Sequence, residues 1–406
     1  MQDTIRYILT FLLYGNREAL PLVGYTRDDE EAKQYKLNIL PSENSPLYNP
    51  ERDWRDFYPE VLEALSRKQI TPDTDIVSLS CFLLSRAEET VISERDEHGR
   101  FSAEQSVLGR NNLLQIPLVD EYSRWLLKRL ELPLPPQQIA LVNLTHDVDI
   151  LCIYRRLRGM IGGIRRGEGR AVWEAIKNME RDPAFTFPWM IRTDSLLQQS
   201  PVPSQALWFL KATDGKGLDA PQYSLYGHDF RRLIKLIRQS EGRIGLHTSY
   251  AAGTDPTLIR KEKHRLEKAI KMPVTLNRHH WLRSTGIDNM QQLAAAGITD
   301  DYSVGFADRA GFRIATTRSV RWINPKTLQL TPLTLHPLTV MDCTLSNTNY
   351  MNLTEDEAWY YCQRLIDKVR QNNGELTLLW HNSSFMPDNY HKTLYKSVID
   401  YIVSDR

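Results

Sequence analysis

The sequence predicts an α/β protein in two parts, a smaller α+β domain over residues 1–136 and a larger β/α domain over residues 137–406. The chain has 406 residues, and a single hydrophobic core rarely serves more than about 300. Residues 132–136 (LPLPP) contain three prolines, which form a stiff connector that cannot continue a helix. After this connector, apolar runs alternate with amphipathic helical segments, a pattern typical of parallel β/α architecture.

Two architectures fit this alternation, a β/α barrel and a doubly wound sheet. Both place functional side chains at the carboxyl ends of the parallel strands. A helix is expected over residues 118–130, before the boundary, and a capping box at Thr354 predicts the start of another. Strands are expected at residues 139–144, 185–191, 207–211, 244–246, 274–276, 335–341 and 376–380.

Composition places the chain among ordinary globular proteins, with 41% hydrophobic and 25% charged residues. Its 51 basic and 50 acidic residues give a net charge of +1, so no global attraction to nucleic acid or anionic membranes is expected. No apolar stretch reaches the roughly 20 residues of a membrane span, and no signal peptide is recognised. Four cysteines without a C-x-x-C pair predict free, buried thiols. We therefore expect a cytoplasmic protein.

Several predicted strands end at side chains that can bind a metal ion or move a proton. Because these ends share one rim in a parallel β/α fold, the side chains are expected to lie close together. A divalent ion of the zinc type needs oxygen and nitrogen donors at about 2 Å, and this rim supplies both. The five strand ends are residues 145–149 (THDVD), 247–250 (HTSY), 278–280 (RHH), Asp342 and 381–382 (HN).

The first of these ends carries two carboxylates, on Asp147 and Asp149. Side chains two apart on a strand share a face, so both should face one centre while His146 points into the packing. A single Asp after a strand is more often the N-cap of the next helix, and a lone His is more often structural. Five such ends together favour a functional site.

Four of these segments resemble the ordered motifs of the NodB-homology polysaccharide deacetylases, the carbohydrate esterase family 4 fold. They are residues 145–149, 245–250, 278–283 and 378–382. Residues 96–101 and 117–122 are similar to segments of a bacterial branch with an extra N-terminal domain. The resemblance implies a distorted β/α barrel and a metal-dependent hydrolase that removes an N- or O-linked acetyl group from a sugar or polysaccharide. It also implies a divalent cofactor, expected to be zinc.

The resemblance further implies a role for individual residues. Asp147 corresponds to the general base, His381 to the general acid that protonates the leaving amine, and Arg278 to the arginine that orients the base. Asp149 and His247 correspond to metal ligands. The family's second motif ends in a histidine, but Ala251 occupies that position here. We expect the third ligand to be His280 rather than His279, since neighbouring residues on a strand face opposite ways.

The substrate contacts expected from the sequence are Tyr250, Trp380, Asp342 and Asp308. Residues 154–170 are rich in arginine, which favours either contact with an anionic substrate or a solvated helix face. Three other functions stay open. They are a glycan-binding relative that has lost part of the metal site, a metal hydrolase acting on a non-sugar amide, and a docking role for the N-terminal part. The expected partner is an acetylated sugar, with no nucleic acid.

Overall fold

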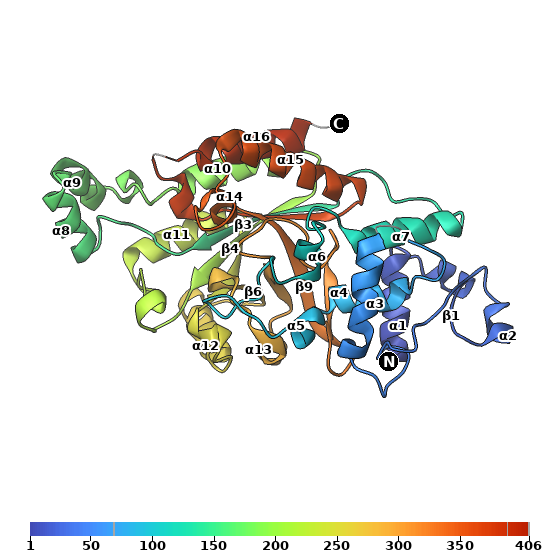
Figure 1. Ribbon diagram of the computed structural model, residues 1–406. Helices are drawn as coiled ribbons and strands as arrows, with labels where there is room; N and C mark the ends of the chain where they lie inside the picture. The colour runs from blue at the N-terminus through green and yellow to red at the C-terminus, as the bar shows by residue number, and fades with distance from the viewer. Residues whose placement is uncertain (68–69, 388, 405–406) are drawn as a thin grey trace.

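In the part of the chain that the structure describes, seven parallel strands close into a barrel (Figure 1). This computed structural model describes residues 1–67, 70–387 and 389–404. The strand order is β10-β3-β4-β5-β6-β7-β9, and pairing of β9 with β10 closes the ring. The strands are β3 (Leu141–Val148), β4 (Ser204–Lys211), β5 (Arg243–Thr248), β6 (Leu276–His279), β7 (Asp300–Val304), β9 (Gln329–Met341) and β10 (Glu375–Leu379). The predicted β/α barrel is confirmed.

Helices surround the barrel and cover the outer faces of its strands (Figure 1). They are α10 (Phe187–Gln198), α11 (His228–Gln239), α12 (Leu258–Ile270), α13 (Gly286–Ala295), α14 (Asp342–Ser346), α15 (Glu355–Gln371) and α16 (His391–Ser404). The Thr354 capping box is present at the start of α15. The strand predicted over residues 185–191 is wrong, because Pro188 lies in the first turn of α10, where proline favours a helix.

One further strand lies outside the ring. β8 (Val320–Asn324) pairs with β9 in the antiparallel direction. β8 lies on the side of β9 that faces the N-terminal part of the chain. There, α4 (Ile76–Leu84) contacts β8. The sequence predicted neither β8 nor β7.

The N-terminal part is mostly helical and lies against the β8–β9 side of the barrel (Figure 1). Its one small sheet pairs β1 (Val23–Tyr25) in parallel with β2 (Leu37–Ile39). The segment 75–80, predicted as a short strand or the start of a helix, begins α4. The remaining helices are α1 (Gln2–Leu12), α2 (Asp29–Ala32), α3 (Trp54–Arg67), α5 (Glu88–Val91), α6 (Val107–Arg110) and α7 (Leu118–Arg129).

A single hydrophobic cluster runs through both parts of the chain. It includes Ile8 and Phe82 from the N-terminal part, and Met290, Trp322 and Leu335 from the barrel part. A second cluster fills the space between the barrel and its outer helices. The domain boundary at residue 136 stays a prediction, and residues 405 and 406 of the predicted second domain lie outside the described residues.

A helical pair projects from the barrel directly after β3 (Figure 1). It consists of α8 (Leu157–Arg165) and α9 (Gly169–Lys177). Within the described residues, no helix combines the length and apolar character needed to cross a membrane. The four cysteines are free thiols, of which Cys343 alone is not fully buried.

Candidate metal centre

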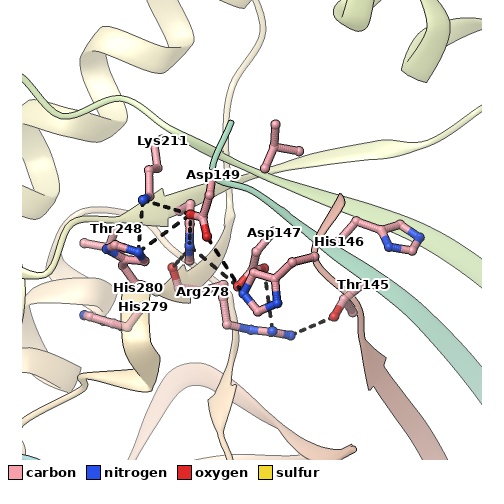
Figure 2. Close-up of polar contacts among 12 residues, drawn as sticks. Thr145, His146, Asp147, Asp149, Lys211, Thr248, Arg278, His279 and His280 are labelled. Atoms are coloured by element: carbon pink, nitrogen blue, oxygen red, sulfur yellow. Dashed lines mark hydrogen bonds and ion pairs between the residues drawn. The ribbon is translucent and has the colours of Figure 1, made fainter. Parts of the chain in front are cut away.

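The structure brings Asp149, His247 and His280 together at the carboxyl ends of their strands. Figure 2 shows two of them, Asp149 and His280, side by side. Their donor atoms all lie within 4.8 Å of one another. The Asp149 Oδ1 atom lies 3.5 Å from His247 Nε2 and 3.6 Å from His280 Nε2. Two tetrahedral ligands at about 2.1 Å from one ion are separated by about 3.4 Å. The spacing therefore fits one divalent cation of the zinc type.

The state of the two imidazoles also fits metal binding. His247 is fully buried and donates from Nδ1 to the Arg278 carbonyl at 3.0 Å, which leaves the lone pair of Nε2 facing the centre. His247 Nε2 is a buried atom without a hydrogen bond in the described structure. Burial lowers the pKa of His280 to about 4, so its ring is neutral at pH 7. A neutral imidazole is the form that binds a metal.

A lysine ammonium group lies beside the same donor atoms of Asp149 and His280. The Lys211 side chain, 8% exposed at the end of β4, has its Nζ 2.8 Å from Asp149 Oδ1. It also donates to His280 Nε2 at 2.9 Å (Figure 2). A cavity of about 710 Å³ adjoins Lys211. The ammonium group would therefore compete with a metal ion for two of the three candidate ligands.

Asp147 lies beside the three ligands, facing the same centre as Asp149. Its Oδ2 is 3.6 Å from His247 Nε2, and its Oδ1 is 3.6 Å from an Arg278 nitrogen. Arg278 is fully buried, donates to Thr145 Oγ1 at 2.9 Å, and lies over the Phe209 ring. The guanidinium thus forms a buried ion pair with the Asp147 carboxylate, and its role in orienting a base stays a prediction.

His381 faces the same centre from the end of β10. Its Nε2 lies 3.9 Å from a carboxylate oxygen of Asp147 and 3.9 Å from one of Asp149. Its Nδ1 donates to Asp342 Oδ1 at 2.8 Å, and its backbone N–H donates to the other oxygen of that carboxylate. Burial alone would lower the pKa of His381, but the negative charge of Asp342 outweighs it and raises the pKa well above its usual value.

The two other histidines at these strand ends turn away from the centre (Figure 2). His146 contacts the Trp380 carbonyl at 3.1 Å and Asp194 at 3.0 Å, within the packing. His279 faces Asn277 and Ser303. Between the adjacent histidines, His280 is therefore the one in the metal-spaced cluster.

Two of the expected substrate contacts, Trp380 and Asp342, are fully buried, whereas Asp308 is half-buried and its contact with substrate stays a prediction. Trp380 is fully buried against Tyr395, with ring centroids 5.0 Å apart, and has no face open to a sugar. Asp342 is also fully buried and binds His381 instead of facing a substrate. Asp308 accepts a hydrogen bond from the Ala103 backbone at 3.1 Å, so it links the barrel to the N-terminal part.

Tyr250 is half-buried at the rim and contacts a residue that the sequence did not single out, His98. The Tyr250 hydroxyl lies 3.2 Å from His98 Nδ1. The His98 ring also packs on Trp281, at a centroid distance of 4.5 Å. His98 belongs to the N-terminal part, which therefore reaches the rim of the candidate site.

A second residue of this N-terminal turn, Arg100, holds the chain next to His280. Arg100 donates to the Trp281 carbonyl at 3.1 Å and is itself fixed by Asp96 at 2.7 Å. Trp281 and Leu282 both have left-handed backbone, with φ of 62° and 53°. Such a conformation costs about 1–2 kcal/mol per non-glycine residue and occurs where surrounding contacts enforce it.

Asp219 completes the surroundings of the centre. It accepts hydrogen bonds from the backbone of Tyr250 at 2.7 Å and of Ala251 at 2.9 Å, and its Oδ1 lies 3.9 Å from His280 Nδ1. It thus supports the loop in which Ala251 stands where the resembled family has a histidine. Asp219 ends a single turn of 3-10 helix, and no sequence signal marks it. Lys211 did have a signal, because it ends a predicted strand.

The fold and the site define a β/α barrel with a three-residue metal-spaced cluster, flanked by a carboxylate and a buried histidine. Residues 20–135 match a family of unknown function (DUF7033). A crystal structure from Mycobacterium smegmatis described as a "putative polysaccharide deacetylase" is similar, with 14% sequence identity and a TM-score of 0.43. That match covers 67% of this chain and 87% of the other. The comparison with curated proteins gave no match.

Proposed function

We propose that the chain is a metal-dependent hydrolase that removes an acetyl group from an acetylated sugar or polysaccharide. The observation that carries the proposal is the convergence of Asp149, His247 and His280 at metal-ligand spacing, with Asp147 and His381 at its edge. The resemblance of the strand-end motifs to those of NodB-homology deacetylases supports the acetylated sugar as substrate. We propose zinc as the ion, because one carboxylate and two imidazoles suit it.

The roles of the side chains follow from their positions. A divalent ion held by Asp149, His247 and His280 would polarise the acyl carbonyl and lower the pKa of water. Asp147, which forms an ion pair with Arg278, would accept a proton from the attacking water. His381 keeps its proton because of Asp342, and is placed to give it to the departing amine or hydroxyl oxygen. Acetate and a free sugar amine or hydroxyl are the products.

Two substitutions separate metal binding from turnover. Asp149→Ala should abolish metal binding and acetate release together, because it removes one of three ligands. Asp147→Asn should keep the metal but lower turnover by about 10²–10⁴-fold, the usual effect of losing a general base. The measurements are bound metal after dialysis and acetate released from N-acetylated and O-acetylated sugar oligomers. Asp214→Asn, which changes an exposed carboxylate outside the centre, is the control.

Full metal content in Asp149→Ala, or full activity in both variants, would overturn the assignment.

One specific observation favours a second candidate, a glycan-binding protein without catalysis. Lys211 already provides a cation between Asp149 and His280, which would hold the site together without a metal. That function predicts a wild-type protein that binds acetylated oligomers, retains no metal and releases no acetate.

A further inference from the structure

The helical pair α8–α9 exposes an unusual number of large apolar side chains. Within the described residues, five of the fifteen exposed large hydrophobic side chains lie in this segment of 21 residues. Leu157 is 71% exposed, Ile164 56% and Trp173 58%, and Ile161 and Ile176 are also exposed. Single exposed apolar residues are normal on a protein surface, but a concentration of this kind marks an interaction surface.

These side chains are not needed to hold the pair together. A separate small cluster joins Val172 and Ala175 of α9 to Tyr154, which precedes α8, and Met160 of α8 packs against it. Gly163 allows that close approach, because a Cβ there would lie 2.6 Å from Val172. Leu157, Ile161 and Ile164 recur at helical spacing, so they form one face of α8 that points away from this cluster.

The helical pair, together with the two residues before it, is also strongly positively charged. Residues 155–177 contain seven Arg or Lys and two Glu, a net charge of +5 in a chain whose total is +1. Three of the seven pair with carboxylates, namely Arg155 with Asp229, Arg166 with Glu168 and Arg170 with Glu174. In the described structure, no carboxylate lies within ion-pair distance of Arg156, Arg158, Arg165 or Lys177.

We propose that the α8–α9 pair docks on the surface of a membrane that contains anionic lipid. Helices with an apolar face and flanking arginines lie in the lipid headgroup region, and tryptophan favours that interface. Anionic headgroups complement the four unpaired cations. A second copy of the chain fits less well, because two surfaces of like charge repel each other.

The residues just before the helical pair line the same cavity as a residue of the candidate metal centre. Arg155 and Arg156, at the base of the pair, line the cavity that adjoins Lys211. This cavity therefore joins the residues just before the pair to Lys211 of the candidate metal centre. The proposal does not depend on the proposed function, since it uses neither the metal ligands nor the acetyl substrate.

Vesicle flotation with the full chain tests the proposal, using phosphatidylcholine alone and phosphatidylcholine with about one-third phosphatidylglycerol. The wild-type chain should bind the anionic vesicles at least tenfold more strongly than the neutral ones, and salt should release it. Two double variants, Ile164→Ser with Trp173→Ser and Arg158→Glu with Arg165→Glu, should each weaken binding at least tenfold. Leu196→Ser removes an equally exposed apolar side chain from α10 and should leave binding unchanged.

Because the substituted side chains are exposed, circular dichroism should show an intact fold in every variant. The proposal is overturned if the wild-type chain does not float with anionic vesicles, or if both double variants bind as the wild type does. It is also overturned if sedimentation equilibrium finds a wild-type dimer that the serine variant dissociates while no chain binds vesicles. That result would make the face an interface between copies.

Discussion

Replacing Lys211 by methionine should tighten metal binding while it weakens the metal-free fold. The ammonium lies 2.8 Å from Asp149 Oδ1 and 2.9 Å from His280 Nε2, two of the atoms that an ion must take. Methionine keeps most of the side-chain volume but cannot compete for either atom. In the metal-free variant, the Asp149 carboxylate has lost its ammonium partner. A buried charge without a partner destabilises the folded state.

The size of the effect follows from these two contacts. A hydrogen bond to a charged group contributes about 1.5–3 kcal/mol. In the wild type, metal entry breaks two contacts, and the displaced ammonium recovers part of the loss by solvation in the adjoining cavity. A net cost near one such bond, about 1.5–3 kcal/mol, corresponds to roughly 10–100-fold tighter metal binding in the variant.

Titration calorimetry with Zn²⁺, in competition with a chelator, measures the affinity, and thermal unfolding with and without metal measures stability. Lys261→Met, which removes an exposed lysine paired with Asp214, is the matched control. Metal affinity that is unchanged or lower in Lys211→Met would refute the competition, because it would mean that Lys211 supports the ligands rather than occupying their centre.

Three further changes have defined outcomes. His381→Gln should lower turnover by about 10²–10⁴-fold with bound metal retained, since it removes the proton donor but no ligand; metal loss in the variant would contradict this. Burial would lower the pKa of His336, but hydrogen bonds with Asp300 and Glu375 outweigh it and raise the pKa from 6.5 to about 9. The stabilisation from that charge is full below pH 6.5 and is lost as the pH rises through 9. The free energy of unfolding of the wild type, measured by denaturant melts, should therefore fall by about 3 kcal/mol over this window, and that of His336→Gln should not. Arg100→Met should weaken metal binding about tenfold by releasing the Trp281 carbonyl, whereas Tyr7→Phe, which removes a distant contact between α1 and β8, should not.

The sequence was informative where one local rule decided the outcome. The two-residue strand repeat predicted that Asp147 and Asp149 face one centre and that His280 and His279 face opposite ways. Both expectations agree with the structure, although Asp149 directly follows β3 and His280 begins a 3-10 turn after β6. The barrel followed from alternating strands and helices together with the family resemblance. The run at 185–191 was misassigned because a short apolar segment has the same composition in a strand and in a buried helix.

Contacts between distant segments were beyond such rules. Lys211 ended a predicted strand, yet its bond to His280 joins residues 69 positions apart. Trp380 was predicted as the last residue of a strand and directly follows β10, but packing against α16 buries it completely. The arginine-rich segment after β3 fitted an anionic substrate or a solvated face, and the exposed apolar side chains between those arginines became evident only in three dimensions.

The N-terminal part and the barrel are best understood as one functional unit. Arg100 fixes the backbone next to His280, while Arg283 of the barrel donates to the His98 carbonyl at 2.6 Å and to the Tyr250 carbonyl at 2.7 Å. These bonds tie the N-terminal turn to the loop that follows β5, the strand of His247, and to the loop that follows β6, which begins with His280. Since one hydrophobic cluster also spans both parts, a barrel produced without residues 1–136 would expose apolar surface and lose the support of one metal ligand. The N-terminal part therefore contributes to the structure of the candidate site, whether or not it also binds a partner.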